Sequence, residues 1–382
     1  MTSPPELDTA DREVADADPA EATTPPATGP GLDRPPLLEL RDVSMDFQIS
    51  RGWFGTRGRM KVRAVRDVSL TIGQGETVGL VGESGSGKTT LGRCILRAHR
   101  PSAGSIIYHT ADGDQVDLVQ SDANELRRHR RDIRMIFQDP NSSLNPRLTV
   151  SQIIAEPLIN LKQGLDSKLA RGELQDRVIE TMRLVGLRPD QAERYPHAFS
   201  GGERQRVGIA RALITNPRLV VCDEAVTALD VSIRSQVLNL LQELQERLGL
   251  TYLFISHDLA VIKHLCDRVA VMYVGELVEQ APAEELFRRP RHPYTEALLA
   301  SLPVPDPYRR RDDRPGISGE IPDPAEQIPG CVFHPRCPHA QDRCATDVPG
   351  HHQTGPDTVS RCHFAEDLNL LGIGRRPGGS SR

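Results

Sequence analysis

Five apolar runs organise the central part of the chain. They are short and continuous rather than alternating, and polar residues, glycine or proline separate them. Runs of this kind are typical of strands that are buried on both faces of a parallel sheet. They lie at residues 77–81, 133–137, 218–222, 251–255 and 268–274. A parallel sheet at the centre of the molecule is therefore predicted.

Helical spacing appears between these runs. Residues 231–248 carry apolar positions three or four apart and stop at Gly249, which predicts a long amphipathic helix. Residues 87–98 predict a helix after the glycines that end the first run. From about 150 to 215 the period is again helical, with glycine and proline stops, and a helix is expected over 203–215. Strands that alternate with helices indicate an α/β fold with a helical insertion in its middle.

The two ends of the chain differ from its centre. Residues 37–48 and 62–72 predict two strands ahead of the first apolar run, and hence a β flank over about 37–75. Residues 1–36 contain eight prolines, eight acids and two bases, with almost no large apolar side chain. Such a segment buries too little surface to offset its ordering entropy, so a disordered acidic tail is predicted.

Charge and hydropathy narrow the class of protein. The whole chain carries −5, and the first 36 residues carry −6 (two bases minus eight acids), which leaves +1 for the remainder. This balance argues against a strongly basic nucleic-acid binder, so no nucleic-acid partner is expected. No run approaches the roughly 18 apolar residues of a membrane span, and no secretory signal is visible. A cytoplasmic protein that serves a membrane only through partners is expected.

A phosphate-binding loop follows the first apolar run. Residues 82–89, Gly-Glu-Ser-Gly-Ser-Gly-Lys-Thr, match the pattern G-x4-G-K-[ST], with a buried strand before them and a helix after them. Glycines let backbone N–H groups curl around phosphate oxygens, and the helix N-terminus adds a positive dipole end. Lys88 is expected to reach the β- and γ-phosphates, and the Thr89 hydroxyl to ligate Mg²⁺. The residues predicted to bind the nucleotide here are Gly82, Ser84, Gly85, Ser86, Gly87, Lys88, Thr89 and Thr90.

Two carboxylates end the third apolar run. Asp223 and Glu224 come directly after the apolar residues 219–222. Open α/β sheets bind ligands at the carboxyl ends of their strands. Asp223 is expected to serve Mg²⁺, and Glu224 to act as the base that polarises an attacking water.

A second anion-binding turn precedes the helix predicted over 203–215. Ser200, Gly201 and Gly202 form a Ser-Gly-Gly turn at a helix N-terminus, which can bind an anion or simply cap the helix. A second phosphate site is redundant within one subunit. It becomes useful if it serves the nucleotide of another subunit across a dimer.

With these motifs in order, the chain resembles the ATP-binding subunits of ABC transporters. Residues 199–203 (Phe-Ser-Gly-Gly-Glu) resemble the signature motif of that family, Gln138 the Q-loop, residues 228–230 (Ala-Leu-Asp) the D-loop, and His257 the switch histidine. Phe47 stands where the family places an aromatic side chain on adenine. Glu203 replaces the commoner glutamine, and Ala225-Val226 the usual Pro-Thr or Pro-Val, without removing a catalytic group.

The resemblance implies a fold and a mechanism. The fold would be a P-loop ABC ATPase core with an antiparallel β flank, a helical subdomain over about 140–215 and a C-terminal extension. Its domains would be a tail over 1–36, a nucleotide-binding domain over 37–290 and an extension over 291–382. Two subunits would close head-to-tail on two ATP molecules. The resemblance assigns ATP hydrolysis to Glu224, His257, Gln138 and Lys88, and Mg²⁺ binding to Thr89, Gln138 and Asp223.

The C-terminal part narrows the family further. Residues 292–295 (His-Pro-Tyr-Thr), 319–322 and 334–338 resemble the extension of oligopeptide/dipeptide importer ATPases, and residues near the signature resemble the second, F-type, paralogue of such importers. This implies a heterodimer with the paralogous ATPase, two permease subunits and an extracytoplasmic binding protein, at the cytoplasmic face of the cell membrane. Nickel or glutathione importers of the same branch are alternatives. A soluble ABC ATPase acting on ribosomes or DNA is disfavoured, because tandem cassettes and a coiled-coil insertion are missing.

Seven cysteines fall into two groups. Cys94, Cys222 and Cys266 lie in apolar segments and are expected to be small core residues. Four others crowd near the C-terminus with the spacing C-x5-C-x6-C-x17-C, which suggests a metal site in a reducing compartment; they are Cys331, Cys337, Cys344 and Cys362. The importer branch implies a [4Fe–4S] cluster here. Zinc, with His334, His339 or His363 as mixed ligands, and no metal at all remain alternatives.

Overall fold

Two sheets with a helix between them form the frame of the molecule. The computed structural model describes residues 34–51, 58–162, 171–302, 319–320, 322, 326 and 328–373. The smaller sheet is antiparallel, with the order β2-β1-β4-β5. Its strands are β1 (Pro36–Arg51), β2 (Gly58–Gly73), β4 (Ala103–His109) and β5 (Gln115–Asp117). The predicted antiparallel flank is confirmed and includes two strands that the sequence pattern did not reveal. Residues 1–33 of the predicted tail lie outside the described residues.

The larger sheet has the order β11-β12-β10-β9-β3-β8-β7-β6. The five strands from β9 to β6 run parallel, and each of them begins and ends within one residue of a predicted apolar run. Its strands are β3 (Thr77–Val81), β6 (Ile133–Ile136), β7 (Leu219–Asp223), β8 (Thr251–Ile255), β9 (Arg268–Tyr273), β10 (Glu276–Pro282), β11 (His352–Gly355) and β12 (Thr358–Ser360). The predicted parallel sheet is thus confirmed, although β7 is shifted by one residue, and β10 to β12 extend it with antiparallel strands.

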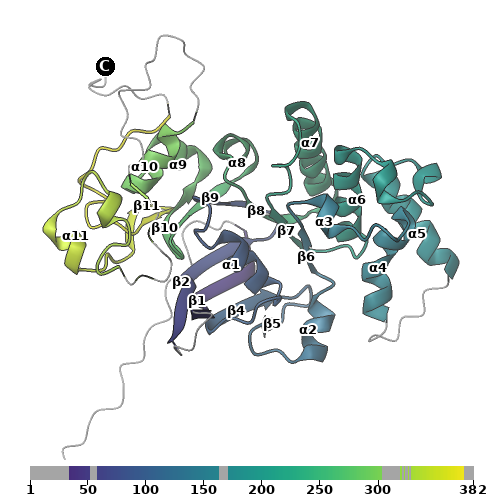
Figure 1. Cartoon of the computed structure of the whole chain (residues 1–382), viewed down its shortest axis with the longest axis horizontal. Helices are drawn as coiled ribbons and strands as arrows, with labels where there is room; N and C mark the ends of the chain where they lie inside the picture. The colour runs from purple at the N-terminus through teal and green to yellow at the C-terminus, as the bar shows by residue number, and fades with distance from the viewer. Residues whose placement is uncertain are drawn as a thin grey trace, which may run out of the picture.

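Helix α1 (Lys88–Ile95) lies between the two sheets (Figure 1). Leu91, Cys94 and Ile95 are buried in one apolar cluster with Leu38 of β1 and Leu80 of β3. The helix is shorter than the predicted 87–98, because the chain turns at Arg97, whose φ is 53°. Burial of this helix between two sheets fixes the position of its N-terminus, where the phosphate-binding loop ends.

Helices also cover the face of the parallel sheet opposite α1. Helices α4, α5 and α6 pack against one another and share a second apolar cluster with α7. The long helix α7 has the predicted bounds, while α6 begins two residues before the predicted 203–215. The helices outside the α1 region are α2 (Ala123–His129), α3 (Pro140–Ser143), α4 (Val150–Lys162), α5 (Arg171–Leu184), α6 (Gly201–Leu213), α7 (Val231–Leu248), α8 (Leu259–Leu265), α9 (Ala283–Arg288), α10 (Pro293–Ala300) and α11 (Asp342–Thr346).

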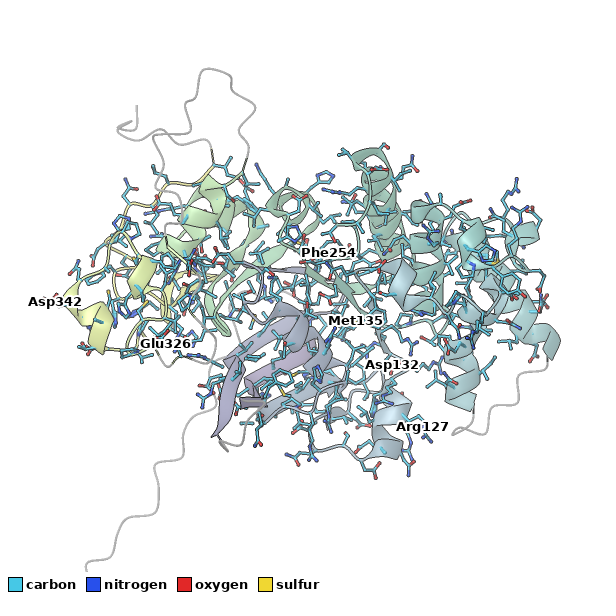
Figure 2. The ribbon with its side chains drawn as sticks, in the orientation of Figure 1. Arg127, Asp132, Met135, Phe254, Glu326 and Asp342 are labelled. Carbon is cyan, nitrogen blue, oxygen red and sulfur yellow. The ribbon has the colours of Figure 1, made fainter. Side chains whose placement is uncertain are left out.

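Side chains sort by environment along these elements. Figure 2 shows Met135 of β6 and Phe254 of β8 in the interior, where both are buried, and Arg127 and Asp342 at the periphery, where both are exposed. Cys94, Cys222 and Cys266 are buried and unbonded, so their prediction as core residues is confirmed. In the described part of the chain, no helix is both long and apolar enough to cross a membrane.

Candidate functional site

The phosphate-binding loop joins a fully buried strand to the helix between the sheets. Every residue of β3 is buried, and α1 begins at Lys88. Gly82 and Gly87 have φ values of 151° and 101°, a region that side chains other than glycine rarely adopt. A Cβ atom on Gly82 would lie 2.1 Å from the Met272 carbonyl oxygen, and one on Gly87 would lie 2.2 Å from that of Ala64. The tight approach of the loop to β9 and β2 therefore requires glycine.

Lys88 folds back over the loop that it follows. Its ammonium group donates to the carbonyl oxygens of Gly82 (2.8 Å) and Glu83 (2.7 Å) and to the Ser86 hydroxyl (3.2 Å). Burial lowers the pKa of Lys88, and the carboxylates of Glu224, Asp223 and Glu83 oppose that shift. A cation held by two backbone carbonyls and one hydroxyl of the loop is placed to transfer its hydrogen bonds to phosphate oxygens.

The Thr89 hydroxyl reaches the end of β7. It donates to the Asp223 carboxylate over 2.9 Å, so the loop and the strand-end acid lie side by side. Burial raises the pKa of Asp223, and the hydrogen bond from Thr89 opposes that rise. A hydroxyl and a carboxylate at this spacing are oxygen ligands of the kind that Mg²⁺ prefers. The predicted pair is therefore brought together.

Glu224 lies between two side chains from neighbouring strands. Its Oε2 accepts a hydrogen bond from the Gln138 amide (2.7 Å), and its Oε1 lies 3.0 Å from Nδ1 of His257. Gln138 follows β6 and His257 follows β8, and these strands flank β7 in parallel. Glu224 itself has φ 47° and donates its N–H to the Ile255 carbonyl (2.9 Å), which holds the residue in a strained backbone conformation.

Four predicted residues lie apart from this group. Ser200 caps α6 and exchanges hydrogen bonds with Glu203, whose carboxylate accepts from both the N–H and the hydroxyl of Ser200 (2.9 Å each). These two bonds lower the pKa of Glu203. Gly201 and Gly202 begin α6, whose buried side chains pack against the face of the parallel sheet opposite α1. Phe47 lies on β1, partly buried, with its ring 5.4 Å from that of His99.

Comparisons with known proteins identify the family of this chain. A family model described as "ABC transporter" matches residues 65–227, and one described as "Oligopeptide/dipeptide transporter, C-terminal region" matches residues 278–344. The oligopeptide transport ATP-binding protein OppF of Salmonella typhimurium is 48% identical over 316 residues, which are 82% of this chain and 92% of that protein. The chain belongs to the ATP-binding subunits of ABC transporters, in the oligopeptide/dipeptide branch.

Other relatives agree with this membership. The oligopeptide transport ATP-binding protein AppF of Bacillus subtilis is 46% identical over 333 residues, which are 86% of this chain and 97% of that protein. A probable peptide ABC transporter ATP-binding protein of Sinorhizobium fredii is 50% identical over 313 residues, 82% of this chain and 85% of that protein. The chain is therefore an ABC ATPase, and the relatives do not favour the nickel, glutathione, ribosome or DNA alternatives.

A solved ABC cassette shares the core of this fold. The dimeric structure of a post-hydrolysis state of that cassette, bound to ADP and Pi, is 29% identical, with a TM-score of 0.55. The matched region covers 65% of this chain and 99% of the cassette chain. The P-loop ABC ATPase fold is thereby confirmed, and the remaining third of the chain lies beyond the shared cassette.

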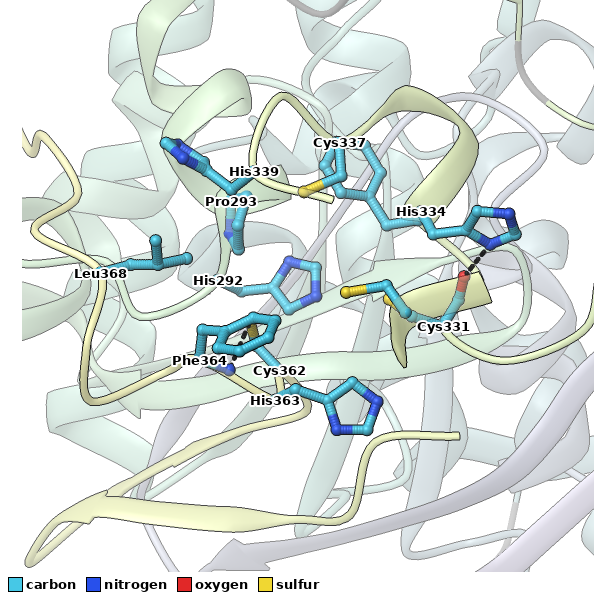
Figure 3. A pocket seen from close by; sticks show the side chains of 12 residues that line it. His292, Pro293, Cys331, His334, Cys337, His339, Cys362, His363, Phe364 and Leu368 are labelled. Carbon is cyan, nitrogen blue, oxygen red and sulfur yellow. Dashed lines mark hydrogen bonds between the residues drawn. The ribbon is translucent and has the colours of Figure 1, made fainter. Parts of the chain in front are cut away.

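The four C-terminal cysteines of this ABC subunit line one cavity. Cys331, Cys344 and Cys362 are buried, Cys337 is partly exposed, and none forms a disulfide. Figure 3 shows Cys331, Cys337 and Cys362 around the cavity, with His292, the N-cap residue of α10, beside them. The cavity is lined by His292, Pro293, Cys331, Phe333, His334, Cys337, His339, Cys344, Cys362, His363, Phe364 and Leu368. The structure thus gathers all four predicted cysteines, together with the three predicted histidines.

The donor set suits a soft metal, but the arrangement is not that of a closed metal site. Burial raises the pKa of Cys337 to about 12 and that of Cys362 to about 11, so both thiols are protonated near neutral pH in this form. Within the described ranges, no three histidine, cysteine, aspartate or glutamate side chains are arranged to hold a metal ion. Binding a cluster therefore requires the thiols to lose protons and to move closer together.

Proposed function

We propose that Glu224 is the catalytic base of ATP hydrolysis in a peptide importer. The observation that carries this role is the placement of its carboxylate between Gln138 and His257, at the strand ends beside Lys88 and Thr89. The carboxylate orients and polarises the attacking water. His257 steadies the γ-phosphate, and Gln138 senses the metal and couples the site to the membrane subunit. Lys88 binds the β- and γ-phosphates.

Mg²⁺ and ATP complete this site. Thr89, Asp223 and Gln138 are the residues proposed to hold Mg²⁺, which neutralises phosphate charge during the reaction. The loop residues Gly82 and Ser84 to Thr90 supply N–H groups and hydroxyls to the phosphates. Phe47 is proposed to stack on the adenine. Support for these roles comes from the Thr89–Asp223 hydrogen bond and from the exposed position of the loop residues Ser84 and Gly85.

A second subunit supplies the turn at Ser200, Gly201 and Gly202. Helix α6, which this turn begins, packs against the face of the parallel sheet opposite α1. The turn is therefore proposed to serve a nucleotide held by Lys88 of a partner rather than of its own chain. The dimeric state of the similar cassette, bound to ADP and Pi, supports this arrangement. The partner proposed is the paralogous ATPase, in a heterodimer.

The whole importer includes further subunits. Two permease subunits carry the peptide, an extracytoplasmic binding protein delivers it, and this chain lies at the cytoplasmic face of the membrane. The printed names of OppF and AppF, which are oligopeptide transport proteins, support this assignment. The domains proposed are a tail over 1–36, a nucleotide-binding domain over 37–290 with its helical subdomain over about 140–215, and an extension over 291–382.

Transport in cells tests the proposed function. In cells whose native copy is replaced by the Lys88→Ala variant, uptake of a labelled oligopeptide should fall to background, because the variant loses its phosphate contact. The matched control is Glu246→Gln, an exposed residue of α7, which should transport normally. Uptake of labelled nickel and glutathione is measured in the same cells. Loss of nickel or glutathione uptake with unchanged peptide uptake would contradict the peptide assignment.

The cysteine cavity is proposed to hold a [4Fe–4S] cluster with a structural role, with zinc as the alternative. Its support is four unbonded cysteines around one cavity. Cys331, Cys337, Cys344 and Cys362 would be the ligands, and the cluster would supply folding free energy to a proline-rich segment.

Purification without oxygen tests the cluster. The protein should be coloured and contain iron and sulfide, and the double variant Cys337→Ser with Cys362→Ser should lose both and melt at a lower temperature. The control Cys266→Ala alters a core cysteine away from the cavity and should keep the iron. Colourless protein with stoichiometric zinc would establish the zinc alternative. Colourless, metal-free protein that stays folded and active would refute any metal role.

A further inference from the structure

The second residue of the phosphate-binding loop is held from the C-terminal part of the chain. Arg336 donates from Nη1 to Glu83 Oε2 (2.8 Å) and from Nη2 to Glu83 Oε1 (3.1 Å), so the pair is bidentate. The backbone N–H of Glu83 donates to the hydroxyl oxygen of Tyr294 (2.8 Å). Two residues that lie more than 200 positions away therefore fix one residue of the nucleotide site.

This contact is largely shielded from solvent. The side chain of Arg336 is 5% exposed and that of Glu83 is 21% exposed. The guanidinium also lies over the ring of Tyr273, 5.8 Å from its centroid, and donates to its hydroxyl (3.3 Å). Bidentate pairs with restricted solvent access are stronger than exposed ion pairs, which contribute little. The ion pair of Arg336 and Glu83 is thus able to influence the conformation of the phosphate-binding loop.

A short turn beside the cysteine cavity holds Arg336 in place. Arg336 ends the 3-10 turn η4 (His334–Arg336), and His334 donates from Nδ1 to the Cys331 carbonyl (2.9 Å). Phe333, just before this turn, packs against Tyr294 with ring centroids 5.4 Å apart. The two groups that reach Glu83 therefore belong to one packed unit, which restricts how the guanidinium can move.

The charge of Glu83 matters for phosphate binding. Its carbonyl oxygen accepts from the Lys88 ammonium, and its carboxylate belongs to the same electrostatic environment as Lys88, together with Asp223 and Glu224. ATP brings several negative charges to this point. A carboxylate in the loop repels them unless a cation is paired with it, since like charges at short range in a partly buried site are unfavourable. Arg336 is the cation paired with Glu83.

We propose that Arg336 is a positioning residue for ATP, which neutralises the Glu83 carboxylate and, with Tyr294, keeps the loop in the form that accepts phosphates. This role rests on the proposed nucleotide site. It makes the C-terminal extension part of the ATP site of its own subunit. Arg336 bonds to Glu83 and Tyr273 rather than to Glu224, Gln138 or His257, so its removal is expected to change ATP affinity rather than the chemical step.

A double-mutant cycle that removes the charges of Arg336 and Glu83 in the purified full-length protein tests the proposal. ATP binding is measured by titration calorimetry, and hydrolysis at saturating Mg-ATP. Arg336→Gln should weaken ATP binding about tenfold, the order expected when one partly screened charge pair is lost. Combining it with Glu83→Gln should restore affinity to within about twofold of the unaltered protein, because no charge then needs a partner. The turnover at saturation should change less than about twofold in each variant.

Two further variants separate charge from shape. Arg343→Gln removes an exposed pair with Asp347 in the same extension and should leave ATP affinity unchanged. Arg336→Lys keeps the charge and should lose affinity only about threefold, since the bidentate geometry is lost. If Arg336→Gln fails to fold, Arg336→Lys and the double variant carry the test.

The outcomes are distinct. A double variant that binds ATP as weakly as Arg336→Gln would show that Arg336 acts only through structure and would overturn the proposal. Unchanged affinity in Arg336→Gln would overturn it as well. Failure of the unaltered protein to bind ATP would instead overturn the proposed nucleotide site itself.

Discussion

Replacing Glu224 with glutamine should leave ATP bound but lower its hydrolysis by about a hundredfold or more, the range expected when a general base is removed. Glutamine keeps the size of the side chain and can still bond to Gln138 and His257, so the fold of the site is retained. What it loses is the carboxylate charge that polarises water. A dimer that closes on ATP and reopens after hydrolysis should therefore accumulate in its closed, ATP-bound form.

Phosphate release and molecular mass with Mg-ATP measure both effects. Glu246→Gln makes the same chemical change on the exposed face of α7 and should hydrolyse ATP at the normal rate. Near-normal turnover of the Glu224→Gln variant would remove Glu224 from its assigned role. Slow turnover without ATP binding would indicate damage to the loop rather than loss of a base.

Replacing Gly82 with alanine should cost about 2–4 kcal/mol of unfolding free energy, which places it among severe single substitutions. The added Cβ would lie 2.1 Å from the backbone oxygen of Met272, and neither backbone segment has room to withdraw from a fully buried sheet. The loop would have to leave β9, so ATP binding should be lost together with stability.

Gly85→Ala is the matched comparison. Gly85 also has a positive φ (81°), but a Cβ there meets nothing within 4 Å. Its cost should be only that of the left-handed backbone, about 1 kcal/mol. Thermal and denaturant unfolding without nucleotide compare the two variants. Equal destabilisation of both would show that backbone conformation, rather than the contact with Met272, decides the outcome.

Elements whose signals are local could be predicted from the sequence. The bounds of β3, β8 and α7 coincide with the predicted 77–81, 251–255 and 231–248. Their signals are a continuous apolar run or a helical period with a glycine stop, and neighbouring residues alone produce them. Strand β10 and helix α10 were not predicted, because their burial depends on partners: Glu279 is buried in β10 and accepts N–H bonds from Arg291 and His292.

The residues of the ATP site also fall into a group that local spacing predicts and a group that the fold brings together. Loop glycines, Lys88 and Thr89 are neighbours in sequence, so their spacing alone predicts a phosphate cradle. Gln138, Glu224 and His257 follow three separate strands, and a prediction that they meet needs the rule that parallel strands end at one edge of a sheet. The structure confirms that they meet, with contacts of 2.7 and 3.0 Å.

The C-terminal extension makes contacts that the sequence pattern did not predict. Its cysteines are far in sequence from Lys88, and the family resemblance assigned residues 291–382 to an extension separate from the nucleotide-binding domain. The structure instead joins β12 to β10 in the central sheet and places Arg336 against Glu83. No local pattern marks either contact.

The sequence by itself determined the phosphate loop, the parallel strands and the family, because each is written in short spacings that neighbouring residues produce. Tertiary structure alone decided the strand order, the gathering of four cysteines around one cavity and the pairing of Arg336 with Glu83. Contacts between residues hundreds of positions apart depend on how all the buried faces pack together. Closing the long loop between such residues costs entropy, and only the completed packing offsets that cost.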